Sequence, residues 1–142
     1  MADLYALELA LELDDSTPEP VLALIRDHMA PYPEDDAYDD GDVDEDEYVP
    51  PPFRVLAERG PAYRVGGTCS AGLTRTPHGW TLTARQEIHA ECLPDAEALL
   101  TALTPHLTTP DAPLGTLRFY EDITPEPITA DAASGLLRFP GA

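Results

Sequence analysis

Lysine is absent from this 142-residue chain, and eight arginines are its only permanently basic residues, against 27 aspartates and glutamates. The formal net charge is therefore −19. A surface this negative repels nucleic acid and anionic lipid, so direct binding to nucleic acid or to a membrane is not expected. Opposite charges draw proteins together, so the expected macromolecular partner presents a basic protein surface.

Cysteine is scarce as well. Cys69 and Cys92 are too few for a disulfide framework, and their spacing is not that of a metal site. No stretch approaches the roughly 18 consecutive apolar residues of a membrane span. The N-terminal sequence "MADLYALELALELDD" contains acidic residues and lacks the basic start of a signal or transit peptide. Together these absences predict a cytoplasmic protein with reduced thiols.

Apolar residues are plentiful, at 43% of the chain, and the length suffices for one domain with a hydrophobic core. We expect residues 1–142 to form a single domain. Residues 31–52 are expected to form a mobile acidic loop inserted in that domain, because prolines at both ends stop regular structure. Ten of the chain's acidic residues lie in this tract, between Glu34 and Glu47, and no basic residue accompanies them.

Periodicity predicts the elements around this tract. Residues 4–13 place leucines at every second position, which predicts a strand. A helix is expected from Pro18 to about Met29, and a second one from Pro94 to Pro105. The second helix is expected to bury an apolar stripe formed by Ala96, Leu99, Leu100 and Leu103. Residues 62–75 and 80–92 flank the turn "TPHG", which predicts a hairpin. A further strand is expected in "LGTLRFYE", and the tail from Pro127 is expected to form a short hairpin or an edge addition.

The hairpin register follows from placing Arg75 opposite Trp80. One face then becomes apolar and the other polar, as a correct register requires. The predicted apolar pairs are Leu73–Leu82, Ala71–Ala84, Val65–Ala90 and Tyr63–Cys92, and the predicted polar pairs are Thr74–Thr81, Ser70–Arg85 and Arg64–Glu91. The order of elements predicts an α+β fold of the ferredoxin-like split βαβ type, an antiparallel sheet with two helices on one face, plus the acidic insertion and the C-terminal extension.

The acidic tract matches part of the EF-hand calcium loop. With Gly41 in the sixth place, carboxylates occupy the first, fifth, ninth and twelfth places: Asp36, Asp40, Asp44 and Glu47. These places supply oxygen ligands to Ca²⁺, and the glycine permits the sharp turn. Tyr38 occupies the third place, where a carboxylate is usual, and the flanking prolines exclude the two EF-hand helices. Calcium is therefore one alternative, and no other cofactor is expected.

The remaining side chains of the tract are candidates for contact with a partner. Carboxylates steer a basic surface toward the tract, and aromatic rings add contact area. The candidate partner-binding residues are Asp35, Tyr38, Asp39, Asp42, Asp46 and Tyr48.

A second candidate cluster lies in "RQEIHAE", where alternation places Arg85, Glu87, His89 and Glu91 on the polar face of one strand. Clustered carboxylates around a histidine are compatible with an acid/base pair or a weak divalent-metal site. The same pattern is typical of a solvated face with cross-strand ion pairs, which contribute little to stability. His28, outside this cluster, is expected to end the first helix, where a cation is favoured.

These observations favour a small acidic cytoplasmic interaction protein that binds a basic macromolecular partner, in an immunity-like, inhibitory or adaptor role. One alternative is a calcium-responsive acidic loop protein. The other is a small-ligand or enzymatic module that uses the open sheet face around His89, and enzymatic activity is the less favoured interpretation. Homodimerisation through the open sheet face or the added edge is compatible with the predicted fold.

Overall fold

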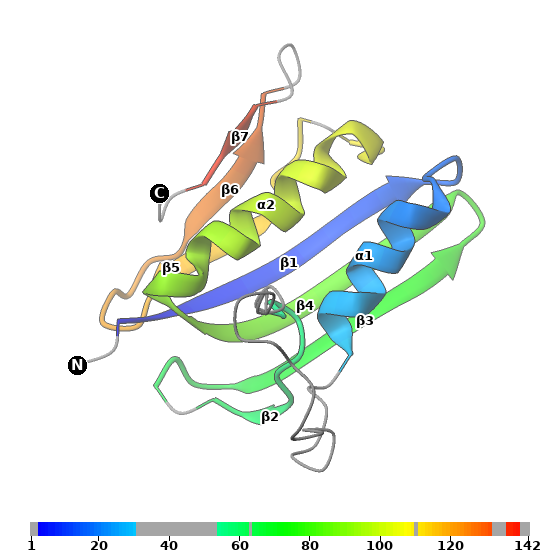
Figure 1. The fold of residues 1–142 in the computed structure, drawn as a ribbon. Helices are drawn as coiled ribbons and strands as arrows, with labels where there is room; N and C mark the ends of the chain where they lie inside the picture. The colour runs from blue at the N-terminus through cyan, green and yellow to red at the C-terminus, as the bar shows by residue number, and fades with distance from the viewer. Residues whose placement is uncertain (1–2, 31–53, 63, 110, 132–135, 140–142) are drawn as a thin grey trace, which may run out of the picture.

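A computed structural model of the chain describes residues 3–30, 54–62, 64–109, 111–131 and 136–139. These residues form an α+β structure with a seven-stranded antiparallel sheet and two α-helices (Figure 1). The strands are β1 (Leu4–Asp14), β2 (Gly60–Pro61), β3 (Thr68–Thr76), β4 (Gly79–His89), β5 (Gly115–Phe119), β6 (Glu126–Ala130) and β7 (Leu137–Arg138). The α-helices are α1 (Glu19–Met29) and α2 (Leu93–Leu103), and two short 3₁₀ helices, η2 (Ala90–Cys92) and η3 (Thr104–His106), flank α2.

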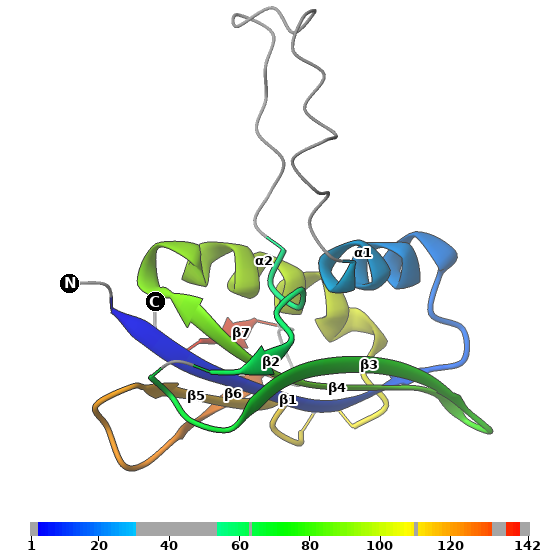
Figure 2. The ribbon, with the colours of Figure 1, turned by 90° about the horizontal axis from the view of Figure 1, so that it is seen from below.

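The strands follow the spatial order β2-β3-β4-β1-β5-β6-β7. Both α-helices lie against the same side of the sheet, as Figure 2 shows. We call this side the covered face and the opposite side the open face. The predicted ferredoxin-like arrangement is not confirmed, because the sheet has seven strands and is larger than that fold requires. The predicted C-terminal extension is present: β6 pairs with β5, and β7 pairs with β6 in a short hairpin at the sheet edge.

Strand β1 lies in the middle of the sheet, between β4 and β5. Leucine and glutamate favour helices, yet a helix would distribute the leucines of β1 around its circumference. In the strand, Leu7, Leu9, Leu11 and Leu13 all reach the core, while Glu8 and Glu12 are exposed on the open face. Burial of one complete apolar row therefore outweighs helix propensity here, and the prediction of a strand is confirmed.

The predicted hairpin register is confirmed along most of its length. Arg75 pairs with Trp80, Leu73 with Leu82, Ala71 with Ala84, Thr74 with Thr81 and Ser70 with Arg85. The pairs predicted farther from the turn for Val65 and Arg64 are wrong, because β3 begins only at Thr68. Gly66 and Gly67 precede it with φ angles of 79° and 76°. In this left-handed region the chain turns away from an extended course, so the described residues 62 and 64–67 form a loop, which we call the 62–67 loop.

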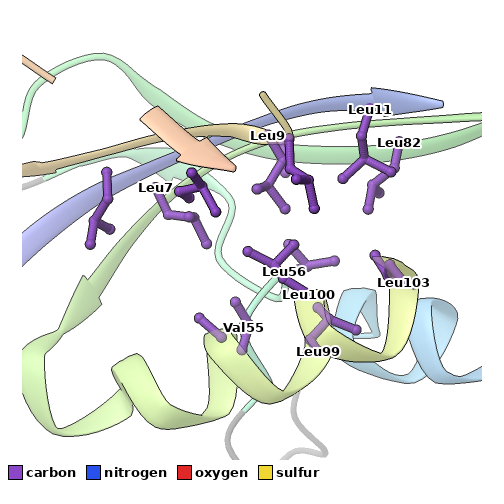
Figure 3. Close-up of a cluster of buried hydrophobic side chains, with 14 of the residues drawn as sticks. Leu7, Leu9, Leu11, Val55, Leu56, Leu82, Leu99, Leu100 and Leu103 are labelled. Atoms are coloured by element: carbon purple, nitrogen blue, oxygen red, sulfur yellow. The ribbon is translucent and has the colours of Figure 1, made fainter. Parts of the chain in front are cut away.

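The core fills the space between the sheet and the two helices. The apolar stripe predicted for α2 is buried, and α1 buries Leu22, Ile25 and His28. The covered face of the sheet contributes Leu7, Leu82 and their neighbours (Figure 3). Val55 and Leu56, which belong to no helix or strand, also enter this core, and Leu56 lies between α2 and the sheet (Figure 3). Among the described residues, no helix is long and apolar enough to cross a membrane.

Candidate functional site

The acidic tract of residues 31–52 lies outside the described residues. This applies to the predicted calcium ligands Asp36, Asp40, Asp44 and Glu47, and to the candidate partner contacts Asp35, Tyr38, Asp39, Asp42, Asp46 and Tyr48. The structure does describe the residues on either side of the tract, from Ala30 backwards and from Arg54 onwards. These two stretches define how the tract is attached to the fold.

The two stretches are hydrogen-bonded to each other. The Leu56 amide donates to the His28 carbonyl oxygen at 3.2 Å. The guanidinium of Arg54 donates through Nη1 to the Ala30 carbonyl at 3.2 Å, and that of Arg59 donates through Nη2 to the Met29 carbonyl at 3.3 Å. We call residues 28–30 together with residues 54–59 the anchor. The acceptors are the last carbonyls of α1 and the residue after it, which have no partner within the helix and so are available.

The His28 side chain belongs to the anchor and is buried, with 7% of its surface exposed. Its Nδ1 atom accepts a hydrogen bond from the Val55 amide at 3.0 Å. Burial lowers the pKa of this imidazole from its ordinary value of 6.5, although the carboxylates of Asp95 and Asp27 act in the opposite direction. A helix end favours a cation, whereas burial and the hydrogen bond that Nδ1 accepts both oppose a protonated imidazole at this position.

Gln86 joins the anchor to the sheet. Its side chain lies on the covered face of β4 and is fully buried. The Oε1 atom accepts a hydrogen bond from the Glu58 amide at 2.9 Å, and Nε2 donates to the carbonyl oxygens of Glu58 at 3.2 Å and Ser70 at 2.9 Å. A buried amide with both ends satisfied specifies one arrangement, because any shift of the 54–59 segment leaves polar atoms unpaired.

On the open face, Arg85 and Glu87 hold the 62–67 loop against the sheet. Glu87 accepts hydrogen bonds at Oε2 from the amides of Arg64 at 2.7 Å and Val65 at 3.0 Å. The Nη2 atom of Arg85 donates to the Gly66 carbonyl at 2.8 Å, and Nη2 of Arg118 donates to the Val65 carbonyl at 2.8 Å. Arg85 and Glu87, two of the four residues of the predicted cluster, therefore have a structural role, and Val65 within the loop is buried.

The other two members of the predicted cluster lie at the end of β4. His89 is the last residue of the strand, pairs with Leu4 and is exposed. Glu91 has left the strand for η2 and is exposed as well. The alternation that placed all four residues on one face ends at His89, so Glu91 does not continue the row. Within the described ranges, no three histidine, cysteine or acidic side chains are close enough to hold a metal ion.

Arg85 also forms an ion pair with Glu8 across β4 and β1, as expected for directly opposed residues of opposite charge. Half of the Glu8 side chain remains exposed to water. Water and salt screen such a pair, so it contributes little to stability. The ion pair of Glu8 and Arg85 therefore lies on a solvated surface of the sheet.

The middle of the open face carries a shallow hollow of about 350 Å³. Small side chains and hydroxyl groups form its floor, and its lining includes Ala10, Ser70, Thr83 and Thr116 beside the Glu8–Arg85 pair. A second hollow of about 270 Å³ lies between the second half of β1 and the described residues of 107–109 and 111–114. His89 lines neither hollow. The described part of the open face thus offers a shallow, open hollow around the middle of β1 and β4, lined by small side chains, hydroxyl groups and one ion pair.

Both cysteines are free thiols. Cys69 is buried and Cys92 is partly buried, and burial raises the pKa of each thiol. A raised pKa keeps a thiol protonated and weakly nucleophilic at neutral pH. Neither cysteine therefore has the environment of a catalytic nucleophile.

Three features of the anchor were missed by the sequence reasoning: the burial of Val55 and Leu56, the role of Gln86 and the acceptor role of His28. Gln86 did carry a signal, because alternation in β4 places it on the same side as Leu82, Ala84 and Ile88. A glutamine on an apolar row must find partners within the protein. Val55 and Leu56 form an isolated apolar pair without periodicity, so no local pattern identifies them.

No known protein family matches this chain, and no match was found among curated protein sequences or among solved structures.

Proposed function

We propose that this protein is a small acidic interaction protein whose tract of residues 31–52 binds the basic surface of a macromolecular partner in the cytoplasm, in an immunity-like, inhibitory or adaptor role. The observation that carries the proposal is the distribution of charge. Ten of the 27 acidic residues lie between Glu34 and Glu47 with no basic residue among them. Such a concentration of one sign attracts and orients a partner of the opposite sign.

The anchor supports this proposal. Hydrogen bonds join the Ala30 carbonyl to Arg54 and the His28 carbonyl to Leu56, so both attachment points of the tract are fixed to the core. An insertion attached to a rigid scaffold at two adjacent points is a common arrangement for binding loops. The scaffold therefore fixes the two points at which the tract is attached.

The chain's own arginines also support it, because most of them are engaged within the fold. Arg26 pairs with Glu19 and stacks on Trp80, which Arg75 covers as well. Arg64 stacks on Tyr120, and four others bind carbonyl oxygens: Arg54, Arg59, Arg85 and Arg118. Few cations of the chain are therefore available to compensate the tract, and a basic partner can supply them.

For the fold we propose that β5, β1, β4 and β3, with α1 and α2, correspond to a ferredoxin-like core to which β2, β6 and β7 have been added. The spatial order of these four strands and the position of both helices on one face support this correspondence. The proposal places the acidic tract in the connection between the first helix and the second core strand. Because this fold hosts unrelated functions, it adds nothing to the functional argument.

Partner capture from lysate, with three matched baits, tests the function. The first bait is the wild-type chain. The second carries Asp→Asn at positions 35, 39, 42 and 46 in the tract. The third carries four neutralised carboxylates that are exposed on the folded part, at Asp15, Asp111, Asp122 and Glu126. We expect a basic protein that the first and third baits retain at about 50 mM salt and lose as salt rises to roughly 500 mM.

The second bait is expected to lose this partner at every salt concentration. Equal capture by all three baits, or no specific partner at low salt, contradicts the proposal. Calorimetry with Ca²⁺ on the wild type and on Glu47→Gln tests the calcium alternative. Binding heat at about 1 mM Ca²⁺ that the substitution abolishes would favour a calcium-responsive loop instead.

A further inference from the structure

One residue of α1 holds two consecutive amides of the segment that follows the acidic tract. The Val55 amide donates to His28 Nδ1 at 3.0 Å, and the Leu56 amide donates to the His28 carbonyl oxygen at 3.2 Å. The side chains of Val55 and Leu56 are inserted into the core and are 1% and 0% exposed. A single titratable residue therefore accepts the hydrogen bonds from both backbone amides of this apolar pair.

An imidazole nitrogen accepts a hydrogen bond only when it carries no proton. The bond from Val55 thus fixes His28 as the neutral tautomer with its proton on Nε2. Protonation at Nδ1 would place two N–H donors against each other and would also bury a positive charge. Both effects oppose the closed arrangement, because a buried donor without an acceptor and a buried charge are each costly.

The charged groups around His28 come from three elements. Asp95 on α2 and Asp27 on α1 favour the protonated imidazole, whereas Arg54 and burial oppose it. Burial is the largest of these effects, so the pKa of His28 in the closed state lies below its ordinary value of 6.5. A depressed pKa means that the stabilisation is fully present above about 6.5 and is lost as the pH falls through the lowered value.

We propose that His28 is an acid-sensitive latch, whose protonation releases Val55 and Leu56 from the core and detaches residues 54–57 from the end of α1. The hydrogen bonds of Gln86 to Glu58 do not titrate and keep the following residues on the sheet. Opening is therefore local. This inference goes beyond the proposed function, since it concerns the attachment of the tract and requires no partner.

Amide hydrogen exchange of the wild-type protein, followed by NMR between pH 7.5 and pH 5.0, tests the latch. Protection factors, which correct for the intrinsic pH dependence of exchange, are compared for Val55 and Leu56 and for the β4 residues Leu82 and Ile88. Between the ordinary pKa of 6.5 and the lowered pKa we expect the protection of Val55 and Leu56 to fall by up to about tenfold per pH unit, and to level off below the lowered value. The β4 amides are expected to keep their protection.

Two substitutions assign the effect to His28. In His28→Asn, an amide oxygen takes a place close to that of Nδ1 and does not titrate, so protection of Val55 and Leu56 is expected to be independent of pH. The matched control, His78→Asn, lies in an exposed turn and is expected to behave as the wild type. An equal fall of protection in His28→Asn and wild type overturns the proposal, as does constant protection in the wild type.

If His28→Asn does not fold, nitrogen chemical shifts of the wild-type imidazole decide the question. We expect a proton on Nε2 at neutral pH and a titration midpoint below 6.5. A proton on Nδ1 at neutral pH, or a midpoint at or above 6.5, overturns the latch. The result does not depend on whether the tract binds a partner.

Discussion

Residues 54–59 of the anchor and the 62–67 loop are both irregular segments that side chains of β4 fasten to the sheet. The two segments lie on opposite faces of the sheet, and different kinds of contact hold them. On the covered face, neutral groups make the buried contacts of the anchor, namely Gln86 and the imidazole of His28, together with apolar burial; the less buried guanidiniums of Arg54 and Arg59 bind carbonyl oxygens at the end of α1. On the open face, charged groups hold the loop, namely Glu87, Arg85 and Arg118. Neighbouring residues of β4 thus hold two segments whose contacts differ in how strongly salt and water weaken them.

This difference between the two faces arises because the neutral contacts of the anchor are buried, whereas those of the 62–67 loop are partly exposed to water. Buried neutral hydrogen bonds and apolar contacts are little affected by salt, and removing a partner leaves an unsatisfied group in the interior. Charged hydrogen bonds at a half-exposed surface are screened, and water replaces a lost partner. We therefore expect substitutions in the anchor to be more destabilising than those in the 62–67 loop.

The largest expected effect belongs to Leu56→Ala. The Leu56 side chain is completely buried, so truncation removes apolar contacts and leaves a cavity. We expect a loss of about 2 to 5 kcal/mol in the free energy of unfolding, measured by denaturant titration. The control is Ile123→Ala, because Ile123 is 94% exposed, and it should change stability by no more than about 0.5 kcal/mol. Similar values for the two variants would show that Leu56 is not a core residue.

The next largest effect is expected for Gln86→Leu, which keeps the approximate size but removes every hydrogen bond of the side chain. The Glu58 amide and the carbonyl oxygens of Glu58 and Ser70 then lose their partner. We expect destabilisation of about 1 to 3 kcal/mol and faster hydrogen exchange of the Glu58 amide. A variant as stable as the wild type would mean that these groups find other partners and that Gln86 does not fix the anchor.

A smaller effect is expected for Glu87→Gln on the open face. The carboxylate binds the amides of Arg64 and Val65, and an uncharged amide oxygen makes weaker hydrogen bonds. We expect a loss of about 1 kcal/mol, reduced at high salt, with faster exchange of these two amides. Glu91→Gln, at the exposed end of the same predicted row, serves as the control and should have no measurable effect on stability. An effect as large as that of Gln86→Leu would contradict the proposed difference between the faces.

The smallest effect is expected for Glu8→Gln, which removes the ion pair with Arg85. Because this pair is half-exposed, we expect a change below about 1 kcal/mol in unfolding free energy that disappears at high salt. Arg85 retains its hydrogen bond to Gly66, so the 62–67 loop should stay in place. A larger, salt-independent loss would indicate that the open face is less solvated than its exposure suggests.

The regular elements could be predicted from the sequence because each carries its own periodic signal. The leucines of β1, the register of β3 and β4, and the stripe of α2 were all readable in this way. The candidate site was predicted less well. Alternation placed Arg85 and Glu87 on the correct face, but their role depends on a loop whose course is set by the positive φ of Gly66 and Gly67.

The anchor could not be predicted because its interactions join residues far apart in the chain. His28 and Val55 are separated by 27 positions, and Glu58 and Gln86 by 28. No local pattern indicates that an acceptor on α1 will meet an amide beyond the acidic tract. Likewise, the depressed pKa of His28 follows from burial, which depends on tertiary packing, whereas the sequence showed only a histidine at a helix end.

The proposed function makes the acidic tract, which the anchor attaches to the core, the binding element of this protein. The most direct test of this proposal is the affinity of a captured basic partner as a function of salt, for wild type, the tract-neutralised chain and the chain neutralised at Asp15, Asp111, Asp122 and Glu126. We predict that only the tract substitutions weaken binding strongly and reduce its salt dependence. Equal weakening by both sets of substitutions would contradict the claim, because it would show that net charge alone, and not the tract, drives the association.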